Sequence, residues 1–303
     1  MVRETPDPRA LPARYYAGVR LGEFNIAVAS DLPEVVSDIR SLYRGAPTSH
    51  RDQKGALAVE VRATHRSVLG ISRYGVFCDG RPLRTRIRAA QVLPHVEWGI
   101  NYQMISKRRD LLQLHAATLS YRGVGVVFAA PSGCGKSTLA AALLARGWQY
   151  LCDEFALIDP NNLELQPFPK ALCLKSGSFE LANVLRLPLA TRRCYVKGIK
   201  GQVGYINPFA LGQQAIARRS PLEFVVFPRY QPHGDVRIWP VSQGKAAFNL
   251  ARCALNRYEF RDNAVDLFSR IASKTKALAL QTGEPEATCD VLEQMIEGGI
   301  KDG

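Results

Sequence analysis

The sequence has no run of apolar residues close to the roughly 20 that a membrane-spanning helix needs. Its first residues, MVRETPDPRALPARYY, contain no basic segment that leads into an apolar one, so the pattern of a secretory signal is missing. The seven cysteines are scattered, without a CxxC pair or a CxxC…HxxxH spacing. Neither a disulfide scaffold nor a zinc site is predicted. The sequence therefore predicts a cytoplasmic protein without a membrane segment.

Acidic residues are few relative to basic ones, with 27 Asp and Glu against 40 Lys and Arg and a net charge of +13. The excess is concentrated in residues 166–222, where Glu180 is the one acid. We call this segment the basic block; its basic residues are Lys170, Lys175, Arg186, Arg192, Arg193, Lys197, Lys200, Arg218 and Arg219. Such a block favours phosphate-bearing or acidic ligands and can also hold nucleic acid. The plainer alternative, a solvated basic face, stays open.

With 47% hydrophobic and 22% charged residues, the 303-residue chain has the composition of a globular protein of one or two domains. Residues 1–108 alternate short apolar runs with Gly, Asp and Pro, which predicts a small α/β module rich in strands, with a helix near residues 32–43. Residues 109–303 have a different pattern and are expected to form a second, larger domain.

A strand, a loop, a helix and a strand follow one another from residue 123 onward. Residues 123–130 (GVGVVFAA) are apolar and β-branched, as in a strand buried on both faces. Residues 136–147 have apolar side chains at helical spacing and end on Gly147. Residues 148–152 return to an apolar strand that ends on Asp153-Glu154. This order is that of a βαβ unit and predicts an α/β fold.

Further elements are expected toward the C-terminus. Apolar runs predict strands at residues 222–227 and 236–241. Helical patterns follow at residues 244–258 and 263–281, with a last, short helix at 291–296.

The loop between the first strand and the helix, Ala130-Pro-Ser-Gly-Cys-Gly-Lys-Ser-Thr138, fits the P-loop pattern with Ala130 in place of its first glycine. Its glycines let successive backbone N–H groups face one concavity at the start of a helix, where they can hold a phosphate chain. Lys136 can reach the outer phosphates, and the Ser137 hydroxyl can hold Mg²⁺. An ordinary turn would leave the Gly-x-Gly-Lys-Ser run unexplained. We therefore expect ATP or another nucleoside triphosphate, with Mg²⁺, to bind at Ser132, Gly133, Cys134, Gly135, Lys136, Ser137 and Thr138.

Asp153 and Glu154 come one helix after this loop. In an α/β sheet, the loop at the carboxyl end of the strand next to the P-loop strand lies beside the phosphates. Two carboxylates there can divide the work, one holding the metal and the other accepting a proton from an attacking hydroxyl. The alternative is a structural pair that caps a turn or a helix.

His115 precedes the loop in residues 113–121, an expected strand that would form a hairpin with residues 123–130 around Arg122-Gly123. This hairpin places the imidazole near residues 130–138, which we call the phosphate loop. A structural histidine within a strand is the simpler alternative.

Together, His115, the phosphate loop and Asp153-Glu154 resemble the HPr kinase/phosphorylase family, and its related kinases more than the enzyme itself. In that family a His precedes the P-loop and an Asp-Asp pair ends the next strand; the close match here spans residues 111–159. The resemblance implies a P-loop kinase domain of the HPr kinase type at residues 109–303, after the smaller β-rich module at 1–108. It also implies phosphoryl transfer from ATP to a hydroxyl of a protein, a peptide or a small molecule.

The resemblance also suggests a role for each residue. Asp153 corresponds to the proton acceptor, Ser137 and Glu154 to groups that contact the metal, and His115 to a residue near the transferred phosphate. Lys136, which the loop itself places at the outer phosphates, is our third candidate for a catalytic residue. Glu154 departs from the family's second Asp, and the family's Glu-x-Arg-Gly-Leu-Gly segment is missing, since residues 196–205 keep glycines but have no Glu. That segment concerns the acceptor and the reverse reaction, so acceptor identity and phosphorylase activity stay open.

Two other function classes stay open. A P-loop ATPase coupled to motion or nucleic acid would have a distant acidic strand and an arginine finger, and the short spacing from Lys136 to Asp153 disfavours it. A regulatory module that binds nucleotide without catalysis is disfavoured by the intact Lys-Ser and Asp-Glu pairs. The preference for ATP or GTP and the oligomeric state, a homo-oligomer included, are not indicated. Within the basic block, Lys175, Arg192 and Arg193 are our candidates to hold the acceptor.

We expect the basic block to serve a phosphate or an acidic acceptor rather than nucleic acid, because aromatic side chains suited to base stacking are sparse in it. Titration of the protein with mixed-sequence DNA and RNA at about 0.15 M salt should give dissociation constants weaker than micromolar. Submicromolar binding at that salt concentration would contradict this expectation.

Overall fold

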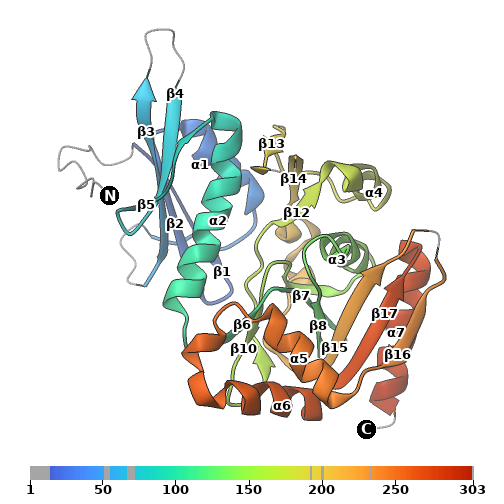
Figure 1. The fold of residues 1–303 in the computed structure, drawn as a ribbon. Coiled ribbons are helices and arrows are strands. Elements are labelled where there is room, and N and C mark those ends of the chain that lie inside the picture. The colour runs from blue at the N-terminus through green and yellow to red at the C-terminus, as the bar shows by residue number, and fades with distance from the viewer. Residues whose placement is uncertain are drawn as a thin grey trace.

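The computed structural model describes residues 14–50, 55–66, 72–191, 193–198, 201–232 and 234–301. Helices and strands alternate along the chain and form a mixed α/β molecule with separate sheets (Figure 1). Among the helices in these residues, none is long and apolar enough to cross a membrane.

The N-terminal sheet has the strand order β1-β2-β3-β4-β5. Its strands are β1 (Tyr15–Leu21), β2 (Phe24–Ser30), β3 (Leu57–Arg66), β4 (Ser72–Cys78) and β5 (Arg81–Ile87). Helix α1 (Pro33–Leu42) is the helix expected at residues 32–43, and α2 (Ala89–Lys107) packs on β3 and β4. The sequence pattern did not predict α2, because Pro94 lies inside it and its apolar residues are not confined to one face.

The central sheet has the order β6-β10-β11-β15-β8-β7-β9, with β17 paired to β15 and β16 paired to β17. Its strands are β6 (Leu112–Leu114), β7 (Ala116–Tyr121), β8 (Val124–Ala129), β9 (Gln149–Cys152), β10 (Ala156–Ile158), β11 (Glu164–Leu165), β15 (Ser220–Tyr230), β16 (Arg237–Pro240) and β17 (Lys276–Thr282). The expected strand at residues 123–130 is β8, which lies inside the sheet between β7 and β15. Strands β8, β15 and β17 run parallel.

Strand β7 lies between β8 and β9 and pairs antiparallel with each of them. The expectation that the strand ending in Asp153-Glu154 is the direct neighbour of the phosphate-loop strand is therefore wrong. The hairpin strand β7 takes that position. Because β7 runs opposite to both, β8 and β9 run in the same direction, and their carboxyl ends meet the same edge of the sheet.

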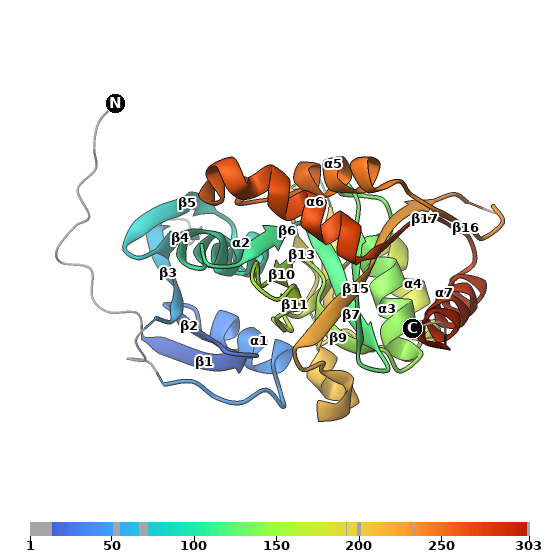
Figure 2. The ribbon, with the colours of Figure 1, turned by 90° about the horizontal axis from the view of Figure 1, so that it is seen from below.

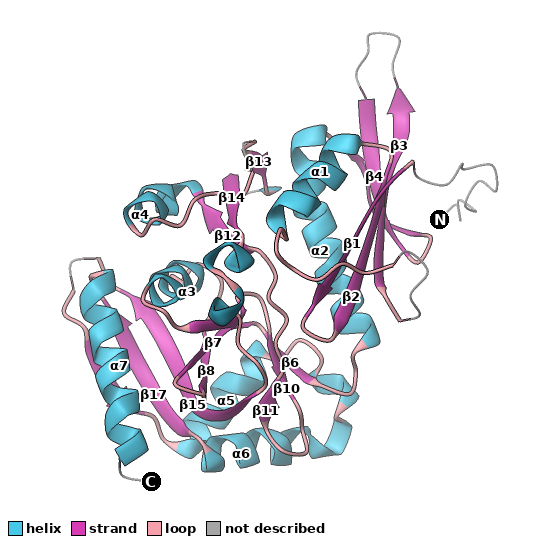
Figure 3. Ribbon diagram, turned by 180° about the vertical axis from the view of Figure 1, so that it is seen from behind, coloured by secondary structure: helices cyan, strands magenta, loops and turns pink. Residues whose placement is uncertain are grey.

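Helices cover both faces of the central sheet (Figures 2 and 3). Side chains of β8 alternate: Val126 and Phe128 pack in one cluster with α3 (Lys136–Ala145) and α7 (Pro285–Lys301). Val127 and Ala129 pack in another cluster, with α5 (Gln243–Cys253) and α6 (Ala264–Lys274). This alternation is what a strand buried on both faces produces.

A small sheet of order β12-β14-β13 lies beside α3 (Figure 1). It consists of β12 (Leu172–Lys175), β13 (Tyr195–Val196) and β14 (Gln202–Ile206), and α4 (Phe179–Val184) follows β12. Short 3₁₀ turns are η1 (Ser176–Ser178), η3 (Pro208–Leu211), η4 (Gln213–Ala215), η5 (Arg257–Glu259) and η6 (Arg261–Asn263). Leu172 and Leu174 of β12 pack into the same cluster as α3.

The expected helix at residues 263–281 is wrong in its second half. Helix α6 ends at Lys274, and β17 begins at Lys276. The segment Lys-Ala-Leu-Ala-Leu has high helix propensity, but its backbone pairs with β15 along its whole length, so the tertiary pairing overrides the local preference. Nearby, α5 is shorter and α7 longer than expected, while the strands expected at 222–227 and 236–241 are β15 and β16.

A buried ion pair joins α2 to the segment before β12. Lys170 Nζ lies 3.0 Å from Glu97 Oε2, and the two side chains are 3% and 6% exposed. Tyr43 donates a hydrogen bond of 2.9 Å to Glu97 Oε1, and Lys170 also donates to Asn101 Oδ1. The core of the N-terminal sheet continues here, since it includes Phe168 and other residues from beyond the expected boundary at residue 108. That domain boundary stays a prediction.

We expect Lys170→Met to lower the free energy of unfolding by about 3–5 kcal/mol, because it leaves a buried carboxylate without its partner. The double variant Lys170→Met with Glu97→Gln should recover part of the loss. Arg219→Met removes an exposed pair with Glu23 and should change the free energy by no more than about 1 kcal/mol. Denaturant titrations of the variants measure these values; equal losses for Lys170→Met and Arg219→Met would contradict the interpretation.

Candidate functional site

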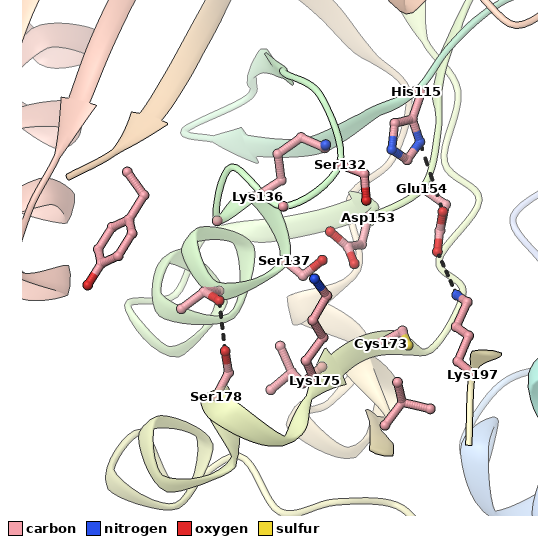
Figure 4. Close-up of a pocket in the computed structure, with 16 residues that line it drawn as sticks. His115, Ser132, Lys136, Ser137, Asp153, Glu154, Cys173, Lys175, Ser178 and Lys197 are labelled. Atoms are coloured by element: carbon pink, nitrogen blue, oxygen red, sulfur yellow. Dashed lines mark hydrogen bonds and ion pairs between the residues drawn. The ribbon is translucent and has the colours of Figure 1, made fainter. Parts of the chain in front are cut away.

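A cavity of about 250 Å³ lies at the edge of the central sheet where β8 and β9 end, between the start of α3 and the small sheet (Figure 4). It brings together nearly all of the site residues that the sequence predicted: His115, Ser132, Gly133, Gly135, Lys136, Ser137, Thr138, Asp153 and Glu154. Cys134 belongs to the same loop but does not line the cavity.

The loop before α3 has a backbone suited to an anion. Gly133 and Gly135 have φ angles of 96° and 83°, in the left-handed region that favours glycine. Gly135 precedes the first turn of α3, which has no acidic residue and no side-chain cap among the described residues. The first N–H groups of the helix are thus left for another acceptor, and the helix dipole favours a negative one.

Lys136 is buried at the base of this loop, 7% exposed. Its Nζ donates hydrogen bonds of 2.6 and 3.0 Å to the carbonyl oxygens of Ala130 and Pro131. Burial lowers the pKa of Lys136, and the nearby Asp153 carboxylate opposes this shift. An ammonium group held in this way beside the loop can reach phosphates that the loop amides bind.

Asp153 follows β9 directly and is 5% exposed. The Ser137 side chain lies next to it in the cavity (Figure 4). One of its carboxylate oxygens, Oδ1, is buried and has no hydrogen-bond partner in the described part of the protein. The turn itself is held by Thr118 of β7, whose hydroxyl donates to the carbonyl oxygens of Cys152 and Phe155 at 3.3 and 3.0 Å.

Burial raises the pKa of Asp153 to about 7, and the neighbouring Glu154 adds to the shift. The neighbouring Ser137 hydroxyl and the charges of Lys136 and Lys197 oppose it. A carboxyl group with a pKa near neutrality is suited to accept a proton at the pH of a cell.

Glu154 lies between the side chains of His115 and Lys197. Its Oε2 lies 4.0 Å from His115 Nδ1, and its Oε1 lies 3.5 Å from Lys197 Nζ. His115 sits between β6 and β7, opposite the start of the phosphate loop, and its backbone N–H donates to the Cys253 carbonyl at 2.8 Å. The hairpin expected around Arg122-Gly123 is present and brings the imidazole to the cavity.

The basic block does not act as one surface. Lys175 and Lys197 line the cavity, whereas Lys170 is buried against Glu97 and Arg219 pairs with Glu23. Arg193 is exposed and does not line the cavity. Arg192 and Lys200 lie outside the described residues. Our candidates to hold the acceptor are Lys175, Arg192 and Arg193. Of the two that the structure describes, Lys175 lines the cavity and Arg193 does not.

Sequence reasoning missed several residues of the cavity. Ser178 of η1 contacts the phosphate loop, because its hydroxyl lies 3.0 Å from Thr138 Oγ1. Cys173 and Tyr230 line the cavity, and Lys197 reaches Glu154 from the β13–β14 hairpin. The excess of positive charge indicated that some residues of the basic block bind a ligand. The sequence did not show that Lys197, rather than one of the other basic residues of the block, would reach the cavity.

A Mg²⁺ ion fits the oxygen atoms at this site in combination with a nucleotide. Ser137, Asp153 and Glu154 present a hydroxyl and carboxylates, the hard ligands that Mg²⁺ prefers, and the unpartnered Asp153 Oδ1 needs a donor or a cation. Within the described ranges, no group of three or more His, Cys, Asp or Glu side chains could hold a metal ion. Mg²⁺ usually binds through one or two carboxylates together with substrate phosphates, which agrees with this arrangement.

Known proteins resemble this chain over part of its length. The family model of the SynChlorMet cassette protein ScmC matches residues 92–186, which include the phosphate loop and Asp153-Glu154. A search of curated proteins finds no match. Among solved structures, the Hpr(Ser) kinase/phosphatase from Coxiella burnetii is similar with a TM-score of 0.31 and 14% identity, over 63% of this chain and 99% of that chain. This structural similarity is weak.

The buried charge of Asp153 should cost stability. Its pKa of about 7 in the folded protein lies above the ordinary 3.8, so the folded state binds more protons between these pH values. The stability of the wild-type protein then falls as the pH rises from 3.8 to about 7, and the loss is complete above that value. Without nucleotide, Asp153→Asn should therefore be more stable than wild type by roughly 1–3 kcal/mol near pH 8, and by less near pH 5.

Denaturant titrations at these two pH values measure the difference. Asp266→Asn, at an exposed position of α6, is the control and should show no gain that grows with pH. A loss of stability in Asp153→Asn at both pH values would mean that the carboxylate is a structural cap rather than a strained functional group.

Proposed function

We propose that this protein is a kinase that binds ATP or another nucleoside triphosphate with Mg²⁺ and transfers the terminal phosphoryl group to a hydroxyl of a protein, a peptide or a small molecule. One observation carries the proposal. A buried carboxylate with a raised pKa, Asp153, lies in the same cavity as a glycine-containing phosphate loop and next to the loop's Ser137 (Figure 4). The match to the ScmC family model spans this loop and this carboxylate.

The donor is held by the loop. Backbone N–H groups between Ser132 and Thr138, together with the start of α3, bind the phosphate chain, and Lys136 neutralises its outer oxygens. Mg²⁺, held by Ser137 and Glu154, would offset the charge that develops on the phosphates. Because these groups are fixed before the reaction, positioning and electrostatics supply most of the acceleration.

The chemical step is an in-line displacement. The acceptor hydroxyl oxygen forms a bond to the terminal phosphorus, the bond from that phosphorus to the bridging oxygen breaks, and the nucleoside diphosphate leaves with the electron pair. The hydroxyl proton passes to Asp153, whose raised pKa allows it to take the proton. His115 lines the same cavity, where it can contact the transferred group.

The acceptor enters from the side of the small sheet. Lys175 and Lys197 face the cavity there, across from the phosphate loop. Two cations at this wall favour an acceptor that is acidic or that carries a phosphate close to its hydroxyl. Lys197 also keeps Glu154 in place through their 3.5 Å contact.

Two substitutions separate binding from chemistry. Asp153→Asn keeps the shape of the side chain and removes the proton acceptor, so phosphoryl transfer should fall about 10²–10⁴-fold while nucleotide affinity changes little. Lys136→Ala should instead weaken nucleotide binding by roughly 10- to 100-fold, since it removes a charge-assisted contact with the phosphates. Asp266→Asn, remote from the cavity, should leave both unchanged.

Binding is measured by calorimetric titration, and transfer by incubating each protein with γ-labelled ATP and a cell lysate. Label on a protein or a small molecule supports the kinase, and label on free phosphate only would make the protein an ATPase. Near-normal transfer by Asp153→Asn would remove the base assignment. Binding of nucleotide with no transfer or hydrolysis would leave a regulatory module.

A further inference from the structure

Another cavity, of about 280 Å³, adjoins the one described above across the start of α3. The two cavities share residues from the phosphate loop, from η1 and from the end of β15, namely Gly135, Thr138, Ser178 and Tyr230. The side chains assigned to chemistry, Asp153, Glu154 and His115, line the first cavity and not this one. A ligand bound across both would therefore have one end at the phosphate loop and the other end away from the reacting groups.

The apolar walls of this cavity suit the faces of a planar ring. Leu139 and Ala142 of α3, Leu181 of α4 and Pro285 at the start of α7 contribute apolar surface. Tyr230, the last residue of β15, also lines it and is 55% exposed. An aromatic side chain left exposed at the rim of a concave apolar site provides a face on which a planar ring can stack.

Another part of the lining comes from Thr282, Gly283 and Glu284, where β17 ends and the chain turns into α7. The turn is held by its backbone: Gln231 N–H donates to the Thr282 carbonyl at 3.1 Å, and Thr288 donates to the Glu284 carbonyl from both its N–H and its hydroxyl. The Glu284 side chain is exposed and can accept hydrogen bonds from a ring amino group.

Strand direction explains why these features meet. Strands β8, β15 and β17 run parallel, so the phosphate loop, Tyr230 and the turn at Thr282 all lie at the carboxyl ends of strands, along one edge of the sheet. Ligands of open α/β sheets bind along this edge.

We propose that this second cavity holds the base of the nucleotide donor, stacked on Tyr230, while the triphosphate lies in the loop beside it. The inference rests on the proposed function, because it assigns one end of the same ligand. An acceptor is a poor fit here, since its hydroxyl has to reach Asp153, which does not line this cavity.

The test compares ATP with inorganic tripolyphosphate, which has the phosphate chain and lacks the base. Both are titrated by calorimetry, with Mg²⁺, into full-length wild type and into Tyr230→Ala, Tyr230→Phe and Tyr258→Ala. Tyr258 is 76% exposed and lies in η5, away from both cavities, so its variant controls for the loss of a surface aromatic ring.

We expect wild type to bind ATP more tightly than tripolyphosphate. Tyr230→Ala should weaken ATP binding about 5- to 100-fold, the usual effect of one base–aromatic stack, and leave tripolyphosphate binding within about twofold. Tyr230→Phe keeps the ring and should bind ATP nearly as wild type does, as should Tyr258→Ala.

Equal affinity of wild type for ATP and tripolyphosphate would overturn the base assignment, and so would a Tyr230→Ala variant that weakens both ligands alike or neither. In these cases the kinase proposal is still tested separately, by the transfer of label from γ-labelled ATP. If wild type binds neither ligand, the proposed function fails and the base assignment fails with it.

Discussion

The antiparallel pairing of β7 with both β8 and β9 is the constraint on which the candidate site depends. It makes β8 and β9 run in the same direction although they do not touch as neighbours. The phosphate loop and Asp153 are therefore delivered to one edge of the sheet, and Thr118 of the same β7 holds the turn after β9 through two hydrogen bonds. His115, just before β7, reaches the cavity for the same reason. One inserted strand thus positions the phosphate loop, Asp153 and His115 relative to one another.

Charge in the cavity is arranged at a cost in stability. Lys136 and Asp153 are both buried, which lowers the pKa of the first and raises that of the second. Asp153 also leaves one buried oxygen without a partner in the described part of the chain. Groups kept in unfavourable surroundings of this kind are typical of functional sites, because a ligand supplies the partners that the fold withholds. The arrangement is easier to explain by ligand binding than by folding.

The small sheet connects the site to the N-terminal sheet. β12 and the β13–β14 hairpin bring Lys175 and Lys197 to the cavity. The chain just before β12 carries Lys170, which is fixed to Glu97 of α2 through a buried ion pair. This pair therefore ties α2 to the chain that leads into β12, which carries Lys175 to the wall of the cavity. The N-terminal sheet therefore packs close to the site. Its core includes Phe155, the residue that follows Glu154.

The sequence by itself determined the features that depend on adjacent residues. We could predict the strand, the glycine-containing loop, the helix from Lys136 and the Asp153-Glu154 pair. A buried strand shows as an apolar run, positive φ angles favour glycine, and a helix spaces its apolar residues regularly, so each can be recognised from neighbouring residues. The tertiary structure decided what depends on distant partners. It placed β7 between the two strands, turned residues 276–282 into a strand against β15, buried Lys170, and brought Tyr230 beside the phosphate loop. Pairing and burial of this kind join residues far apart in the chain, such as Lys170 and Glu97, and no local pattern records which partner each residue finds.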